Sequence, residues 1–137
     1  MKRALLLLAV VVGFAACKTV PTEIPDDLSQ AELIQLAQES ADSENWEAAL
    51  AYYQALLDRF PQDKGATVAA QYEMAFIEYK RGNVDEAQAG FERLLGLYDF
   101  EGNTLPQWPK ILAARLLSEI LAESTDQNAE TAATAAE

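Results

Sequence analysis

Apolar side chains along residues 30–123 recur every three or four positions, with polar side chains between them. This spacing is typical of amphipathic helices, whose apolar stripe returns about every 3.6 residues. No stretch shows the one-by-one alternation of a half-buried strand. We therefore predict an all-α protein built from about five antiparallel helices.

Start and stop signals divide this pattern into segments. Ser29 and Glu32 form a capping box before the first helix. Pro61 stops the second helix because it has no backbone amide to donate. Gly82 ends the third helix, since glycine readily adopts the left-handed conformation found at helix C-termini. The predicted starts of the later helices are Asn45, about Ala66, Asn83 and about Pro109.

The second and fourth predicted helices carry similar sequences. Residues 45–61 read NWEAALAYYQALLDRFP, and residues 83–99 read NVDEAQAGFERLLGLYD. The matching alanines, Ala49 and Ala87, lie 38 residues apart. A period of about 20–50 residues with two helices per unit is typical of a solenoid. The chain repeats this helix because one unit cannot bury its apolar face alone.

These residues resemble the tetratricopeptide repeat, whose unit is about 34 residues long. The family places small residues where two helices cross and a large aromatic residue beside them. The resemblance implies a right-handed helical solenoid with repeats at about 30–63 and 68–101, closed by a capping helix at about 109–123. The residues that carry it are Ala37, Ala49, Tyr53 and Pro61 in the first unit, and Ala75, Ala87 and Phe91 in the second, where Asp99 replaces the proline.

The capping helix is rich in aliphatic residues. Either it packs deeply against the stack or it leaves an apolar patch for a partner. Trp108, just before it, is either a staple that holds the helix or an exposed contact, whereas Trp46 is interpreted as packing at the edge of the first repeat. The residues expected to face inward are Ile111, Leu112, Leu116, Leu117, Ile120 and Leu121.

The first 17 residues, MKRALLLLAVVVGFAAC, have the features of a secretory signal. A basic start precedes an apolar run too short to span a bilayer, and small residues precede the cysteine. Phe14-Ala15-Ala16-Cys17 resembles the lipobox of bacterial lipoproteins. The resemblance implies removal of residues 1–16 and acylation of Cys17, which would anchor the protein in a membrane. Residues 17–28 are then predicted to be a flexible tether, and residues 124–137 a disordered acidic tail.

Composition narrows the function further. The formal net charge is −12, which disfavours nucleic acid and anionic lipid surfaces as partners. The chain has no histidine and one cysteine, so histidine-based catalysis and thiolate zinc sites are excluded. No glycine-rich phosphate-binding motif occurs. We predict neither enzymatic activity, nor a cofactor, nor a metal.

The family resemblance implies that the first helix of each unit lines a binding groove. Tyr72, Phe76 and Tyr79 follow one another at helical spacing, as anchors for an extended peptide or a helix would. The alternative is that these aromatics form the core beneath the capping helix. The predicted groove residues are Ile34, Gln38, Tyr72, Phe76, Tyr79 and Lys80.

Two functions remain open from the sequence. The first is a membrane-anchored module that binds an envelope protein or peptide during envelope assembly or maintenance. The second is a transport-associated accessory lipoprotein that binds a small hydrophobic ligand. Lys18 follows Cys17 where inner-membrane lipoproteins often carry aspartate. This favours the outer membrane, on its periplasmic face or at the surface.

Overall fold

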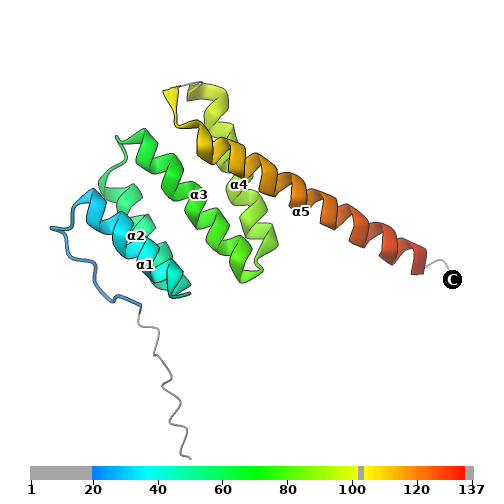
Figure 1. Ribbon diagram of the computed structural model, residues 1–137, viewed down its shortest axis with the longest axis horizontal. Coiled ribbons are helices and arrows are strands. Elements are labelled where there is room, and N and C mark those ends of the chain that lie inside the picture. The colour runs from blue at the N-terminus through cyan, green and yellow to red at the C-terminus, as the bar shows by residue number, and fades with distance from the viewer. Residues whose placement is uncertain (1–19, 102–103, 135–137) are drawn as a thin grey trace, which may run out of the picture.

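The computed structural model describes residues 20–101 and 104–134, which form five helices and no strand (Figure 1). Each helix packs against the next one along the chain, and α5 also contacts α3. The described part is thus an antiparallel, right-handed helical solenoid, which confirms the predicted fold class. Cys17 and the predicted signal lie outside the described residues. The helices are α1 (Gln30–Asp42), α2 (Trp46–Arg59), α3 (Lys64–Arg81), α4 (Val84–Glu101) and α5 (Gln107–Thr134).

The helix ends follow local capping chemistry. The Ser29 hydroxyl accepts a hydrogen bond from the Glu32 amide at 3.3 Å, and the Glu32 carboxylate accepts one from the Ser29 amide at 2.9 Å. α3 begins two residues before the predicted Ala66, because the Asp63 carboxylate accepts a hydrogen bond from the Ala66 amide at 2.9 Å. Gly82 ends α3 with a φ of 82°, in the left-handed region.

Two hydrophobic clusters form the core, one for each repeat. The first is centred on α1 and α2 and is completed by residues of α3. The second joins α3, α4 and α5. Small residues at the crossings let the helices approach, and in each cluster a large aromatic ring packs beside them. The matched residues are Ala37, Ala49 and Tyr53 in the first cluster, and Ala75, Ala87 and Phe91 in the second, and all are buried.

Gly90 marks a close approach between α3 and α4. A Cβ atom built on Gly90 would lie 2.7 Å from the Ala75 Cβ, which is too short for two carbon atoms. The family resemblance assigns the helix crossing to the alanines and not to this glycine. In the first repeat, Tyr52 occupies the position that Gly90 holds in the second, so the repeat pattern gave no signal for it.

The last helix is longer than predicted at both ends. Pro109 was expected to begin it, but α5 begins at Gln107. Proline is tolerated there because amides of the first helical turn have no partner within the helix. At its other end the helix continues to Thr134, so the prediction of disorder is wrong for residues 124–134. Alanine, glutamate and glutamine, which favour helix, make up five of these eleven residues, and the others are threonine, serine, aspartate and asparagine, which favour it less.

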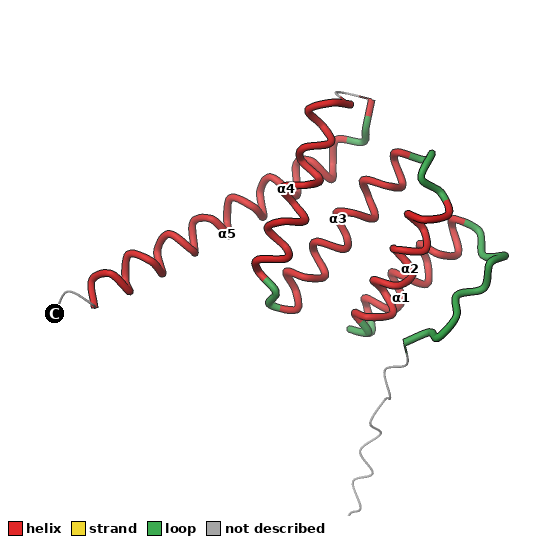
Figure 2. The backbone as a smooth tube through the Cα atoms, turned by 180° about the vertical axis from the view of Figure 1, so that it is seen from behind, coloured by secondary structure: helices red, strands yellow, loops and turns green. Residues whose placement is uncertain are grey.

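The inward face of α5 differs from the prediction. Ile120 is buried, and Leu116 and Leu117 pack partly against the second cluster. Ile111 is 64% exposed, and Leu112 and Leu121 are also exposed, so the inward orientation predicted for these three is wrong. α5 contacts the stack along one side only and then projects past the other helices (Figures 1 and 2). A single buried stripe cannot accommodate six large side chains spread around the helix.

The segment before α1 is not a free tether along its whole length. Ile24 and Leu28 pack against the first cluster. The Arg59 guanidinium, at the end of α2, donates hydrogen bonds to the carbonyl oxygens of Pro25 at 2.6 Å and Ile24 at 2.8 Å. The prediction of a flexible tether up to residue 28 is therefore wrong for residues 24–28, which run along the outer edge of the first repeat (Figure 2).

Candidate binding clefts

A cleft of about 520 Å³ opens between α1 and α3, and we call it the α1–α3 cleft. The first helices of the two repeats form its sides, and α2 contributes to its floor. Its volume lies within the range of about 300–1,000 Å³ that is typical of ligand sites. The lining residues are Gln38, Ala41, Asp42, Glu44, Trp46, Tyr53, Glu73, Phe76, Ile77 and Lys80.

Three of the six predicted groove residues line this cleft. Gln38 enters from α1, and Phe76 and Lys80 enter from α3. Phe76 is partly buried. It packs against the second cluster and also lines the cleft. Ile34 packs against the first cluster and lines a smaller neighbouring recess of about 80 Å³. The structure thus brings Gln38, Phe76 and Lys80 together at one surface.

Tyr72 and Tyr79 do not line the α1–α3 cleft. Tyr72 is only 7% exposed and belongs to the second cluster. Its ring stacks on Phe76 with 6.0 Å between ring centres, and the edge of Trp108 meets it at 5.4 Å. Tyr79 packs partly against the same cluster and stacks on Phe76 at 6.4 Å. For Tyr72, this packing favours the core interpretation over the binding one.

Trp108 combines both of the roles considered for it. Its contact with Tyr72 fastens the start of α5 to α3. The side chain is nevertheless 44% exposed and forms part of the wall of the small recess beside the cleft. Trp46 is partly buried against the first cluster and also lines the α1–α3 cleft.

Glu73 belongs to this site although no feature of the sequence indicates it. It lines both the α1–α3 cleft and the small recess. Burial raises the pKa of its carboxyl group above the ordinary value. Burial, together with the charges of Glu73 and Asp42, also raises the pKa of the Tyr53 hydroxyl. A glutamate within a helical pattern looks like a solvated surface residue, so only the tertiary packing shows that Glu73 is partly buried.

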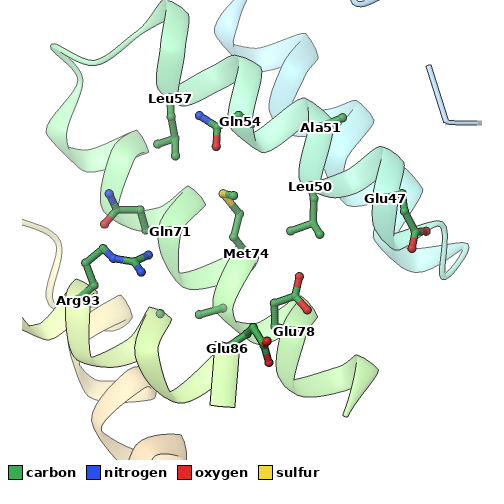
Figure 3. Close-up of a pocket in the computed structure, with 12 residues that line it drawn as sticks. Glu47, Leu50, Ala51, Gln54, Leu57, Gln71, Met74, Glu78, Glu86 and Arg93 are labelled. Atoms are coloured by element: carbon green, nitrogen blue, oxygen red, sulfur yellow. The ribbon is translucent and has the colours of Figure 1, made fainter. Parts of the chain in front are cut away.

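A second cleft, of about 570 Å³, lies between α2, α3 and α4, and we call it the α2–α4 cleft. Leu50, Leu57 and Met74 give it an apolar centre (Figure 3). Glu78 and Glu86 lie together at one end, and Arg93 enters from α4 (Figure 3). No predicted groove residue lines this cleft.

Neither cleft has the features of a metal centre. Within the described ranges, no group of three or more cysteine or carboxylate residues is placed to hold a metal ion. No helix of the described part is both long and apolar enough to cross a lipid bilayer.

The fold and the repeat positions agree with a comparison against protein families. Residues 21–125 match the tetratricopeptide repeat family. The chain belongs to the tetratricopeptide repeat family. This confirms the resemblance inferred from the paired alanines and aromatics, and the match extends over α5 as far as Thr125.

Relatives of the chain are bacterial proteins. It is 36% identical over 103 residues to an uncharacterized protein of Treponema pallidum (strain Nichols), which covers 74% of this chain and 41% of that protein. It is 30% identical over 133 residues to the outer membrane protein assembly factor BamD of Neisseria gonorrhoeae, covering 93% of this chain and 47% of BamD. BamD of a serogroup A strain of Neisseria meningitidis matches to the same extent. The chain thus spans less than half the length of these relatives, and no solved structure matches it.

Proposed function

We propose that this protein is a lipid-anchored interaction module of the bacterial outer membrane, which holds an extended segment of a partner protein in the α1–α3 cleft. The observation that carries the proposal is the convergence of Gln38, Phe76 and Lys80 on one open surface between the first helices of both repeats. Side-chain amides, aromatic rings and ammonium groups can bind both the backbone and the side chains of a peptide. The similarity to an outer membrane protein assembly factor supports a role in envelope assembly.

The anchoring part of the proposal rests on Phe14-Ala15-Ala16-Cys17. Acylation of Cys17 would fasten the protein to the membrane, because stable anchoring needs more than one lipid chain and lipoproteins of this kind carry two or three. Membrane fractionation tests it: wild-type protein should sediment with outer membranes, and Cys17→Ala should be soluble. Membrane retention of Cys17→Ala would refute the anchor.

Site-specific crosslinking tests the interaction. A photoreactive phenylalanine analogue at position 76 should crosslink a defined envelope protein in living cells. The same analogue at Phe100, which is 92% exposed on α4 and outside the cleft, is the matched control. Crosslinking from position 100 but not from position 76 would refute binding in the α1–α3 cleft.

The apolar centre of the α2–α4 cleft favours a second candidate function, the binding of a small hydrophobic ligand by a transport-associated lipoprotein. Nile red provides a direct probe, since it fluoresces in apolar sites. Met74→Gln keeps the side-chain length and makes the centre polar, so it should abolish saturable dye binding. Weak, non-saturable fluorescence that is equal in both proteins would refute this candidate.

A further inference from the structure

Glu73 lies where the two hollows on this face of the molecule meet. With Gln38 and Tyr53, it lines both the α1–α3 cleft and the small recess under Trp108. Its side chain is partly buried. A group bound anywhere along this face would pass close to its carboxylate.

The Glu73 carboxylate lacks a counter-charge within the part of the chain that the structure describes. Among the described residues, no hydrogen bond or ion pair reaches it, and burial alone raises its pKa. Burial raises the pKa values of the Tyr53 and Tyr72 hydroxyls, and the negative charge of Glu73 adds a smaller increase in the same direction. A partly buried carboxylate without a partner is unfavourable in the free protein.

Two carboxylates on the helices that flank the α2–α4 cleft are paired, in contrast to Glu73. Glu78 on α3 accepts hydrogen bonds from Arg81 at 3.2 Å and from the Asn83 side chain at 2.6 Å. Glu47 on α2 pairs with Arg81 at 3.0 Å. The basic residue nearest in sequence that shares the cleft with Glu73 is Lys80, and it forms no ion pair with Glu73. Unfavourable charges that a fold leaves unpaired are concentrated at functional sites.

The charge of the α1–α3 cleft indicates that its ligand carries a positive charge. Its lining contains the carboxylates of Asp42, Glu44 and Glu73 against the single ammonium group of Lys80. An acidic peptide or a free C-terminal carboxylate would be repelled by this lining. Trp46 and Phe76 add aromatic faces, against which the stem and charged plane of a basic side chain can pack.

We propose that the α1–α3 cleft receives an arginine side chain from an extended segment of the partner protein, and that the Glu73 carboxylate binds its guanidinium group. This inference rests on the proposed peptide-binding function and specifies the chemistry of the partner. Arginine suits the site better than lysine because its planar group can donate two parallel hydrogen bonds to one carboxylate and can stack on an aromatic ring.

A phage-displayed library of random twelve-residue peptides, selected on the purified full chain, tests the inference. Peptides that bind should share one basic position, mostly arginine. Replacing that arginine by alanine in a synthetic peptide should weaken binding at least about tenfold, as measured by fluorescence anisotropy. Glu73→Gln should weaken binding of the unaltered peptide to the same degree. The alanine-substituted peptide should bind Glu73→Gln no more weakly than it binds the wild type.

Two controls distinguish the contact between Glu73 and the arginine from effects of overall charge and of protein stability. Glu119→Gln removes the same charge from an exposed ion pair on α5, so it should leave peptide affinity within about twofold of the wild type. Glu73→Gln should unfold at a temperature no lower than the wild type, because it removes an unpaired charge. Lower stability with weaker binding would mean that Glu73 is structural and would overturn the inference.

The outcomes also distinguish this inference from the proposed function. Selected peptides that lose binding with Phe76→Ala, but lack a basic residue and ignore Glu73→Gln, would overturn the arginine site while the peptide cleft stands. A selection that yields no binding peptide, or only peptides that ignore both substitutions, would overturn the cleft and the arginine site together.

Discussion

The two repeats bury matching residues, but different parts of the chain cover them. In the first repeat, Ile24 and Leu28 of the N-terminal segment pack on the cluster, and Arg59 holds that segment in place. In the second repeat, α5 lies across the cluster, and Trp108 covers Tyr72. The α1–α3 cleft therefore opens beside the first repeat, whereas the aromatic surface of the second repeat is partly closed.

The matched aromatics show the same contrast. Tyr53 lines the α1–α3 cleft, where the charges of Glu73 and Asp42 act on its hydroxyl. Phe91 occupies the equivalent position in the second repeat and is completely buried under α5. The repeat pattern thus sets the size of the side chain at this position. The covering segment decides whether a polar group is tolerated there.

The largest effect is expected from Phe91→Ala. Removing this ring should lower the free energy of unfolding by about 3–5 kcal/mol, since the cluster of the second repeat would retain a cavity. Urea denaturation monitored by circular dichroism measures the loss.

Exchanging the two aromatic residues tests the difference between the repeats. Phe91→Tyr should lower the free energy of unfolding by about 1–3 kcal/mol because it buries a hydroxyl group, whereas Tyr53→Phe should leave it nearly unchanged. Equal costs for the two exchanges would contradict the difference between the repeats.

Two glycines of α4 give the second test. Gly90→Ala should destabilise the protein by about 1–3 kcal/mol, because the new methyl group would collide with Ala75. Gly96→Ala is the matched control, since a Cβ there meets no atom within 4 Å. It should stabilise the helix by about 0.5–1 kcal/mol. The melting temperatures of both variants measure these effects. A higher melting temperature for Gly90→Ala would show that α3 and α4 lie too far apart at this position for the methyl group to collide with Ala75.

Arg59→Ala tests the cover of the first repeat. The variant loses the hydrogen bonds to Ile24 and Pro25, which should cost about 1.5 kcal/mol and free the N-terminal segment. Limited proteolysis should then cut within residues 20–28 sooner than in the wild type. Arg115→Ala, which breaks an exposed ion pair on α5, should change neither stability nor cleavage there. An unchanged cleavage rate for Arg59→Ala would contradict the docking.

The smallest effect concerns pH. Burial raises the pKa of Glu73 in the folded protein above its ordinary value of 4.5, so the folded state binds this proton more tightly than the unfolded state. Its contribution to stability is therefore greatest below pH 4.5 and falls as pH rises through the raised pKa. Glu73→Gln should melt slightly higher than the wild type at neutral pH and at nearly the same temperature below pH 4.5.

Glu73 shares its cleft with Asp42, Glu44, Tyr53 and Lys80, and these groups are present in both proteins. The difference in melting temperature between Glu73→Gln and the wild type thus isolates Glu73. If the difference in melting temperature is the same at acidic and neutral pH, burial of the Glu73 carboxylate is not its cause.

The all-α class, the repeat units and their small and aromatic positions could be predicted from the sequence. These features depend on helical periodicity, on capping residues such as Ser29 and on side-chain size at Ala37 and Ala75, all of which are local properties. The length of α5 could not be predicted in this way, since residues 124–134 mix alanines with threonine, serine, aspartate and asparagine and carry no large apolar residue. Of the predicted groove residues, Gln38, Phe76 and Lys80 line one cleft in the structure, and their role in binding stays a prediction.

The tertiary structure alone decided which faces are covered. Periodicity shows that Tyr72, Ile111 and Glu73 each lie on some helix face, but it does not show which neighbour packs there. Trp108 and α5 bury Tyr72, and the one-sided contact of α5 exposes Ile111. The packing around α3 leaves Glu73 partly buried, with no counter-charge among the described residues. The burial of a side chain depends on contacts with segments far away in the chain. It is therefore decided only when the repeats, the N-terminal segment and α5 pack together.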